Sequence, residues 1–327
     1  MKIAVMGATG MLGRHALDAV VAAGHQGVAF FRSTQGLQRL SGLGVECIRA
    51  DLTEPESLPA ALRGVDVLIN AAAYYPTLPR PWRDEVRTAT QLAENLYRAA
   101  GQAQVGRIVY VGGSIALPKR ADGQPARGDE RYASATTNLN PYLQVKWALD
   151  ELALQSAARG LPVSIAIPSM TFGEYDYGPT TGQIIVGVAS GRFRNYVRGQ
   201  RNVVAACDAG RGLLQVAERG VAGQRYLLTG VNTDMDELTA LIARLSGQAN
   251  PKSVSLSIAK GISALQKWRY LYLKGPVPAI SESAIAVMSA GQHLSGESAA
   301  AIGYAPTLNL EATVQRALDW FKQEKML

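Results

Sequence analysis

The sequence predicts an α/β fold built on a parallel β-sheet, and three observations lead to this prediction. Short runs of apolar residues recur along the first half of the 327 residues. Stretches with the apolar spacing of helices lie between most of these runs. The runs are apolar throughout, as expected for strands that are covered on both faces. Strands that alternate with helices pair in parallel through right-handed crossovers.

The first half of the chain is expected to contain six strands and three long helices. The expected strands are residues 3–6, 28–31, 45–48, 65–69, 108–111 and 163–167. The expected helices are residues 12–21, 81–100 and 142–158. Each helix has apolar residues on one face, which would cover the sheet.

The pattern changes after residue 168. Residues 171–200 are rich in Gly and Tyr and predict a loop with a short helix over 182–190. Residues 250–300 have the pattern of amphipathic helices with weak boundaries. The remaining expected elements are a strand and helix over 203–217, a strand over 226–229, a helix over 233–246 capped by Thr233, and a last helix over 310–322.

Composition excludes several classes of protein. Hydrophobic residues make up 47% of the chain and charged residues 18%, which is enough apolar material to bury a core, so the chain is not intrinsically disordered. Its two cysteines and three histidines have no disulfide or metal-ligand spacing, and no metal is expected. The net charge of +7 is mild, and no basic block is interleaved with aromatic residues, so nucleic acid is not an expected partner.

The sequence predicts neither a targeting segment nor a membrane span. The apolar run at the start stops at Gly7, and no stretch approaches the roughly 18 apolar residues that a span requires. We therefore expect a cytoplasmic protein with a small-molecule substrate and no membrane partner. A homodimer is left open, because Trp268, Tyr270 and Tyr272 could form either a lid over a pocket or an oligomer contact.

A glycine motif follows the first expected strand and opens a helix. Its spacing is Gly-x-x-Gly-x-x-Gly, from Gly7 through Gly10 to Gly13. The first glycine permits a tight turn, the second lets backbone N–H groups approach a pyrophosphate, and the third lets the helix pack close to the strand. The positive end of the helix dipole adds attraction for the anion. The residues predicted to hold a dinucleotide here are Gly7, Thr9, Gly10, Met11, Leu12 and Gly13.

The end of the second strand indicates which dinucleotide binds. Proteins that bind NAD typically place an acid there, whereas an arginine can pair with the 2′-phosphate of NADP. This chain has Arg32 at that position and no acid before Glu46. NADP(H) is therefore favoured, and NAD(H) stays possible.

Two later strand ends complete the predicted cofactor site. Asp51 and Leu52 follow the third strand and are placed to meet the adenine. Small side chains after the fourth strand would leave room for the cofactor. These small residues are Ala71, Ala72 and Ala73.

A catalytic group is predicted from the spacing of Tyr142 and Lys146 on one helix face. A phenol has a pKa near 10, and a cation held nearby favours the phenolate, which would allow proton exchange near neutral pH. Ser114 lies just past the end of the fifth strand and offers a hydroxyl donor. Strand ends are where open α/β sheets bind their ligands.

With the glycine motif, Ser114 and the Tyr142-x-x-x-Lys146 pair in this order, the chain resembles the extended short-chain dehydrogenase/reductase family, the NAD-dependent epimerase/dehydratase group. The resemblance covers about the first 245 residues. It implies a Rossmann doubly wound parallel sheet of about seven strands with a smaller C-terminal substrate domain. The implied cofactor domain is 1–168 plus about 203–230, and the implied substrate domain is 169–202 plus 231–327.

The resemblance also implies roles for individual residues. Tyr142 would exchange a proton with the substrate, Ser114 would bind the substrate oxygen, and Lys146 would bind the nicotinamide ribose and tune Tyr142. The turn at Pro168, Ser169 and Met170 resembles the one that lies beside the nicotinamide. Candidate substrate-binding residues are Tyr74, Tyr75, Tyr175, Tyr177 and Arg201, the last matching a position that contacts the phosphate of sugar nucleotides in relatives.

Departures from the family pattern narrow the expected activity. Sugar-nucleotide 4,6-dehydratases carry two acids directly after the Ser114 position, where this chain has Ile115 and Ala116, so dehydration is not expected. An Asn of the preceding helix is replaced around Ala89, which puts an Asn-assisted proton relay in doubt. Arg32 and the Gly-Pro segment resemble the dihydroflavonol-reductase-like branch. We expect an NADPH-dependent reductase of a ketone or aldehyde, with a nucleotide-sugar epimerase holding NAD and a non-catalytic NADP-sensing regulator as alternatives.

Overall fold

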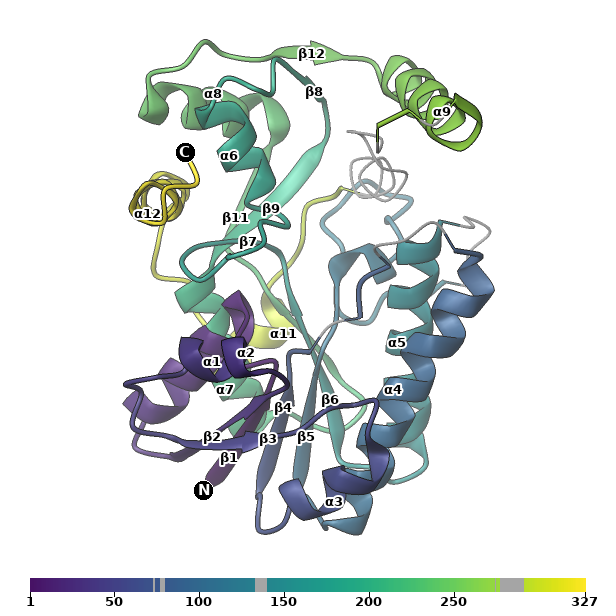
Figure 1. The fold of residues 1–327 in the computed structure, drawn as a ribbon, viewed down its shortest axis with the longest axis vertical. Coiled ribbons are helices and arrows are strands. Elements are labelled where there is room, and N and C mark those ends of the chain that lie inside the picture. Colours follow the sequence, from purple (N-terminus) through teal and green to yellow (C-terminus); the bar gives the residue numbers. More distant parts are fainter. Residues whose placement is uncertain (73, 77–79, 133–139, 274, 277–290) are drawn as a thin grey trace.

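The computed structural model describes residues 1–72, 74–76, 80–132, 140–273, 275–276 and 291–327. A parallel sheet with helices on both faces forms one part of the molecule, and a group of helices and short strands lies beyond its carboxyl edge (Figure 1). The N-terminus belongs to the sheet, whereas the C-terminus lies in the second part (Figure 1).

The sheet has seven strands in the order β10-β6-β5-β4-β1-β2-β3, and all neighbours pair in parallel. Its strands are β1 (Lys2–Met6), β2 (Gln26–Phe31), β3 (Glu46–Arg49), β4 (Val67–Asn70), β5 (Arg107–Val111), β6 (Val163–Pro168) and β10 (Arg225–Leu228). The strand order reverses between β1 and β4, where Met6 pairs with Asn70. Open α/β sheets bind ligands at such a reversal point. The predicted Rossmann sheet of about seven strands is confirmed.

Helices on the two faces of the sheet bury two separate apolar clusters. One cluster includes Leu68 and Leu96, and the other includes Val5 and Leu213. The helices on the first face are α3 (Leu58–Ala61), α4 (Trp82–Gln102) and α5 (Pro141–Ala158). The helices on the second face are α1 (Met11–Ala22), α2 (Thr34–Arg39) and α7 (Ala206–Arg219). Burial on both faces explains why the strands are apolar throughout.

The second part of the molecule has its own apolar cluster, which includes Phe172, Ile242 and Trp320. A three-stranded sheet in the order β11-β9-β7 underlies this cluster, and β12 pairs with β8. The strands are β7 (Met170–Phe172), β8 (Asn195–Val197), β9 (Gln200–Ala205), β11 (Val231–Asp234) and β12 (Lys252–Val254). The helices are α6 (Gln183–Ala189), α8 (Met235–Ser246), α9 (Leu256–Leu273) and α12 (Leu310–Gln323).

Three expectations for this part need correction. The cap of α8 is Asp234, not Thr233, because the Asp234 carboxylate accepts a hydrogen bond from the Glu237 N–H at 2.8 Å. Residues 171–200 hold strands as well as a loop and a helix, since β7 ends there and β8 lies within it. The expected helical region 250–300 begins with a strand, β12, and residues 277–290 lie outside the described residues.

Residues near position 300 pack against the helices of the seven-stranded sheet and join the two parts of the molecule. Ala299, in α11 (Glu297–Ala300), and Tyr304 are buried in the apolar cluster beneath α1 and α7. The Tyr304 hydroxyl donates to the Thr229 carbonyl at 2.8 Å, next to the end of β10. The proposed division into 1–168 plus 203–230 and the remainder therefore stays a prediction, with residues near 300 packed on the cofactor side. Within the described ranges, no helix is long and apolar enough to cross a bilayer.

Candidate active site

Two glycines of the motif are required by the packing of the protein itself. Gly7 has a φ of +84°, and a Cβ on it would lie 2.8 Å from the backbone carbon of Ala71 and the nitrogen of Ala72. A Cβ on Gly13 would lie 2.2 Å from the Gly7 carbonyl oxygen. The β1–α1 turn, the β4 end and α1 therefore approach each other at distances that only glycine permits.

Gly10 is different, because the protein around it leaves space. Among the described residues, the atom nearest to a Cβ on Gly10 would be the Gly7 oxygen at 3.6 Å, and the Gly10 φ of −100° suits any residue. The glycine precedes the first turn of α1, where backbone N–H groups have no partner within the helix. This open cradle at a helix N-terminus fits a dinucleotide pyrophosphate, and the residues that would hold it are Gly10, Met11 and Leu12.

The polar residues at the next strand ends are held in place by local hydrogen bonds. The Asp51 carboxylate accepts from the Thr53 N–H at 2.9 Å and hydroxyl at 2.8 Å. Burial opposes its ionisation, but these bonds and the nearby Arg32 charge hold the pKa of Asp51 below its ordinary value. Leu52 is half-buried, and its carbonyl accepts from Asn95.

The turn after β4 lies directly against the glycine motif. The buried Asn70 side chain accepts from the Ala72 N–H at 3.2 Å, and the Ala71 N–H donates to the Met6 carbonyl at 2.9 Å. Ala71 and Ala72 thus form one wall of the cradle beside Gly7. Ala73, which was also predicted to line the site, lies outside the described residues.

Arg32 lies exposed at the end of β2, on the same side as the glycine motif. Ser33 caps α2 by accepting from the Gly36 N–H at 3.2 Å. A Cβ on Gly36 would lie 3.2 Å from the Thr9 methyl group, so the start of α2 rests on the glycine turn. Within the described residues, no carboxylate lies within ion-pair distance of Arg32.

The turn after β6 offers an unused hydroxyl. Ser169 is buried between Pro168, the last residue of β6, and Met170, the first of β7. Its side-chain oxygen has no hydrogen-bond partner among the described residues, although its backbone oxygen accepts from Thr171. A buried donor without a partner is costly unless a ligand satisfies it, so this position also fits a bound cofactor.

The predicted catalytic residues meet at the end of β5. Asn140 caps α5, and the helix presents Tyr142 in its first turn and Lys146 one turn later on the same side. A Cβ on Gly113 would lie 3.5 Å from Lys146 Cδ, so the lysine stem lies over the residue before Ser114. The Lys146 ammonium is 5.9 Å from the centre of the Tyr142 ring. The structure therefore brings the two α5 residues to the strand end that carries Ser114.

Burial dominates the electrostatics of this group. It lowers the pKa of Lys146 from about 10.5 to about 8. It also raises the pKa of the Tyr142 phenol above its ordinary value, with a smaller contribution from Tyr75. The sequence predicts that Lys146 lowers the pKa of Tyr142, whereas in this structure burial raises it. Tyr142 is therefore a neutral phenol at neutral pH.

Two tyrosines follow β4 and lie near Tyr142. The Tyr75 ring is 4.7 Å from the Tyr142 ring, centre to centre, and is 43% exposed. The Tyr74 hydroxyl donates to the carboxylate of Glu85, a buried residue in the first turn of α4. Sequence reasoning did not include Glu85, because no local signal marks a carboxylate that folds back onto a tyrosine eleven residues earlier.

Tyr175 and Tyr177 lie instead against α1, α2 and α12. The Tyr175 ring is 5.1 Å from the His15 ring, and the Arg14 guanidinium lies 4.6 Å from its centre. Arg39 lies 4.2 Å from the centre of the Tyr177 ring, whose edge meets Trp320. The positions of these two tyrosines are explained by packing between the two parts of the molecule, and their role in substrate binding stays a prediction.

Arg201 is buried in β9 and donates to the Gln200 carbonyl at 2.6 Å. Burial lowers the pKa of Arg201 to about 10. Burial, with a smaller contribution from the Arg201 charge, also lowers the pKa of Lys119, which follows the Ser114 turn. A shallow pocket opens beside this pair. Its lining residues are Lys119, Val197, Arg198, Gly199, Gln200, Leu256 and Gly291.

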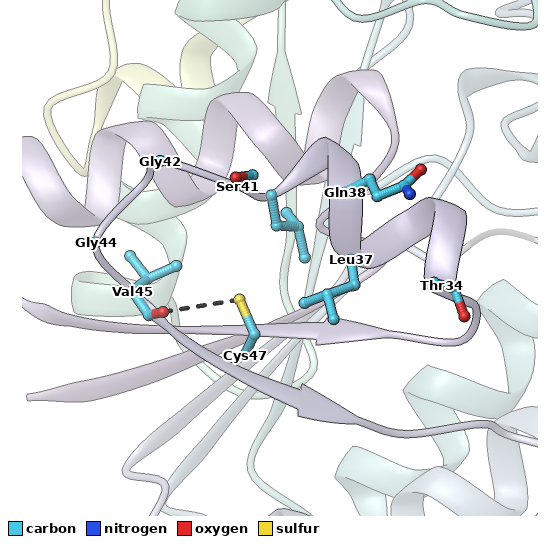
Figure 2. Close-up of a pocket in the computed structure, with 9 residues that line it drawn as sticks. Thr34, Leu37, Gln38, Ser41, Gly42, Gly44, Val45 and Cys47 are labelled. Atoms are coloured by element: carbon cyan, nitrogen blue, oxygen red, sulfur yellow. Dashed lines mark hydrogen bonds between the residues drawn. The ribbon is translucent and has the colours of Figure 1, made fainter.

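A second pocket lies away from the candidate site, between α2 and the edge strand β3 (Figure 2). Cys47 lines it and donates a weak hydrogen bond to the Val45 carbonyl at 3.7 Å. None of the residues predicted to hold the cofactor or the substrate lines this pocket. It therefore does not belong to the catalytic group.

The geometry agrees with what similarity to known proteins shows. A sequence profile of the NAD dependent epimerase/dehydratase family matches residues 3–228. The chain belongs to this family. It is an NAD(P)-dependent enzyme of the extended short-chain dehydrogenase/reductase type, as the glycine motif and the Tyr142–Lys146 pair predict.

Proteins similar to this chain carry demethylase, reductase and epimerase names. Sterol demethylase protein B of Methylococcus capsulatus is 27% identical over the full length of both chains. A 4-hydroxy-2-methyl-3-oxo-4-farnesyl-3,4-dihydroquinoline-1-oxide ketoreductase of Stigmatella aurantiaca is 29% identical over 99% of this chain and 96% of its own. A putative dihydroflavonol 4-reductase of Synechocystis sp. is 28% identical over 76% and 74%. A crystal structure named as a nucleoside-diphosphate-sugar epimerase from Pseudomonas aeruginosa is 40% identical over 100% and 99%, with a TM-score of 0.88.

Proposed function

We propose that the protein is an NADPH-dependent reductase of a ketone or aldehyde that acts through Ser114, Tyr142 and Lys146. The observation that carries the proposal is the buried, neutral Tyr142 phenol next to Lys146 at the end of β5. A phenol that keeps its proton at neutral pH is ready to donate it to a carbonyl oxygen. Reduction is the direction that consumes this proton.

In the proposed step, the hydride comes from the cofactor and the proton from the protein, and the substrate carbonyl accepts both. When bound, the nicotinamide nucleotide supplies a hydride to the carbonyl carbon. Tyr142 Oη donates its proton to the carbonyl oxygen, which becomes the alcohol. The Ser114 hydroxyl donates a hydrogen bond to that oxygen as negative charge develops on it. The Lys146 ammonium stabilises the phenolate that Tyr142 leaves, and solvent then restores the phenol proton.

Arg32 supports NADPH as the cofactor. Its guanidinium is exposed beside the glycine turn, and no described acid pairs with it there. A guanidinium can form two parallel hydrogen bonds to a phosphate, so it would favour the 2′-phosphate of NADPH. Ser33 offers a further hydroxyl at the same edge, where its side chain already caps α2.

We further propose that the carbonyl belongs to a lipophilic molecule. Two relatives that match nearly the full chain are named as a sterol demethylase protein and as a reductase of a farnesyl-substituted ketone. The exposed Tyr75 ring beside Tyr142 offers a flat apolar surface to such a substrate. The dihydroflavonol 4-reductase relative also supports reduction of a ketone.

A nucleotide-sugar epimerase is the second candidate. It is favoured by the 40% identical structure of that name and by the buried cation Arg201 near Lys119. An epimerase returns its hydride to the substrate, so it consumes no cofactor overall. This difference separates the two candidates in a single assay.

The test is to measure NADPH and NADH oxidation with lipophilic ketones, small aldehydes and nucleotide sugars. We expect NADPH oxidation with a lipophilic ketone. Tyr142→Phe should lower turnover by at least about a hundredfold, because it removes the proton donor, while cofactor affinity stays nearly unchanged. Tyr75→Phe is the matched control and should keep the activity, since it retains the ring that packs at a tilt against Tyr142. Conversion of a nucleotide sugar without net cofactor oxidation would favour the epimerase, and an unchanged rate in Tyr142→Phe would refute the proton-donor role.

A further inference from the structure

Two consecutive tyrosines hold the chain after β4 against the first turns of two helices. The Tyr74 hydroxyl donates a hydrogen bond to the carboxylate of Glu85, in the first turn of α4. The ring of the next residue, Tyr75, lies 4.7 Å, centre to centre, from the ring of Tyr142 in the first turn of α5. The two helices contact each other on one face of the large sheet (Figure 1). The place of Tyr75 at the candidate site is therefore linked to Glu85 through the neighbouring residue.

Glu85 is a buried carboxylate beside this segment. Its exposed fraction is 2%, and removal of an ionised carboxylate from water is costly unless hydrogen bonds and charges compensate for it. The positive end of the α4 dipole supplies part of this compensation, because Glu85 lies in the first turn of the helix. Among the described residues, Tyr74 donates a side-chain hydrogen bond to the carboxylate. An apolar residue of similar size would avoid the cost of desolvation, so this hydrogen bond is what the carboxylate adds.

The direction of this hydrogen bond limits what Tyr74 can do. An ionised carboxylate only accepts, so the Tyr74 hydroxyl directs its proton at Glu85. Burial and the hydrogen bond to Glu85 raise the pKa of Tyr74, so its phenol keeps the proton at neutral pH. A hydroxyl that donates its one proton within the protein has none left for a substrate carbonyl. The pair therefore holds the segment in place and does not supply a proton to the reaction.

We propose that Glu85 is a positioning residue: by holding Tyr74, it keeps the Tyr75 ring at the wall that a ketone substrate would contact. This inference rests on the proposed function, because the ketone is the substrate of that proposal. Tyr75 is 43% exposed although it packs on Tyr142, so part of its surface is left for a ligand. After the larger effect of burial, Tyr75 contributes to the raised pKa of Tyr142. Release of Tyr75 would weaken contact with the substrate and let water reach the proton donor.

The first test measures steady-state kinetics with NADPH and farnesylacetone, a lipophilic ketone. Glu85→Ala should raise the KM for the ketone about tenfold, because a hydrogen bond to a charged group is lost, while the Kd of NADPH stays unchanged. Glu85→Gln keeps an acceptor oxygen and should hold KM within about twofold. The matched control is Asp84→Ala, which removes an exposed acid of the same turn that pairs with Arg87 and should leave KM unchanged. A merely structural Glu85 would lower the melting temperature without changing KM, and that result would overturn the proposal.

A double-mutant cycle tests whether Glu85 acts through Tyr74. Tyr74→Phe removes the same hydrogen bond from the donor side and should raise KM by a similar factor. In the Tyr74→Phe background, Glu85→Ala should add less than about twofold, because the hydrogen bond is already absent. Factors that multiply in the double variant would contradict the proposal, since Glu85 would then act by another route. An unchanged KM in Tyr74→Phe would contradict it as well, even if Glu85→Ala did not fold.

Hydrogen exchange of the peptide that contains Tyr74 and Tyr75 gives a readout that needs no substrate. Exchange should be at least about tenfold faster in Glu85→Ala and Tyr74→Phe than in the unmodified protein, because the hydrogen bond restrains this segment locally. Asp84→Ala should exchange as the unmodified protein does. Unchanged exchange in Glu85→Ala and Tyr74→Phe would overturn the positioning role whatever reaction the protein catalyses. Faster exchange in a protein that does not reduce farnesylacetone would support the hold on the segment and count against the proposed function instead.

Discussion

The glycine turn and helix α9 are opposite in how their sequences are constrained. In the glycine turn, Gly7 and Gly13 are dictated by backbone atoms of the protein that lie within 3 Å of where a side chain would begin. In α9, most side chains touch little of the protein, and the residues face outward. The comparison teaches that internal packing explains the identity of a residue in one region and does not explain it in another.

Gly10 lies in the glycine turn, but internal packing does not explain why this residue is a glycine. Its neighbours leave room for a side chain, and its backbone conformation does not require glycine. We propose that a ligand which must approach the backbone explains the identity of Gly10. The same proposal applies to the buried Ser169 hydroxyl, which has no hydrogen-bond partner among the described residues.

The largest expected effect comes from comparing two glycines of one motif. Gly13→Val should cost about 4 kcal/mol or more of folding stability, because its Cβ would overlap the Gly7 oxygen. Gly10→Val should fold normally and lose cofactor binding, since the side chain occupies the space for the pyrophosphate. Urea unfolding and cofactor titration of both variants measure these outcomes. A folded Gly10→Val protein with unchanged affinity would show that the motif is only a turn.

The effect of a leucine on folding stability should differ between the buried sheet and the exposed helix α9. Leu68→Ala, in the fully buried strand β4, should lower the free energy of unfolding by about 2–5 kcal/mol. Leu265→Ala, at a position of α9 that is 58% exposed, should change it by less than about 0.5 kcal/mol. Thermal or urea unfolding of the two variants provides the measurement. A cost above 1 kcal/mol for Leu265→Ala would mean that α9 packs on the protein more closely than its exposure indicates.

Lys146 is expected to be a residue that reduces stability and is kept for function. Its folded pKa of about 8 lies below the ordinary value of about 10.5, so the unfolded chain binds the proton more tightly between these two values. Stability therefore rises with pH across this window, and at pH 7 burial of the charge costs roughly 3 kcal/mol.

Lys146→Met should remove that cost. The variant is expected to unfold at equal or higher urea concentration than the unmodified protein at pH 7, and the difference should shrink as the pH is raised toward 9.5. Turnover should be lost in the same variant, because the amine that supports Tyr142 is gone. A loss of more than about 1 kcal/mol at pH 7 would mean that contacts of the lysine outweigh the cost of its charge.

The smallest expected effect concerns cofactor choice at Arg32. The unmodified protein should bind NADPH more tightly than NADH, and Arg32→Asp should weaken NADPH binding by about 1–3 kcal/mol while affecting NADH less. Arg49→Asp makes the same charge change at a nearby residue that pairs with Glu54, and it should leave the preference intact. Direct titration with both cofactors tests this, and equal affinities in the unmodified protein would contradict the role of Arg32.

Patterns within one element were predictable from the sequence. The strands, the long helices, the glycine motif and the one-turn spacing of Tyr142 and Lys146 are all local, and the structure has them where they were expected. The cap of α8 was misplaced by one residue because Thr233 and Asp234 are both good caps, and only the backbone geometry distinguishes them.

Contacts between distant segments could not be predicted. Glu174 contacts His15 on α1 and pairs with Arg316 on α12, and no single segment of sequence encodes that arrangement. The same is true of the Glu85 carboxylate on Tyr74 and of the burial that raises the pKa of Tyr142. The sign of that shift depends on how much of the phenol is removed from water, which only the folded packing determines.

The return of the chain near residue 300 limits how this protein could be recombined. Ala299 and Tyr304 fill space beneath α1 and α7, and Ser298 accepts a hydrogen bond from the N–H of Leu227 in the edge strand β10. A chimera that exchanges everything after β10 for the corresponding part of a relative would therefore also replace side chains that are buried against the seven-stranded sheet. A graft of the second part of the molecule would need to keep residues 297–304 together with the sheet on which they pack.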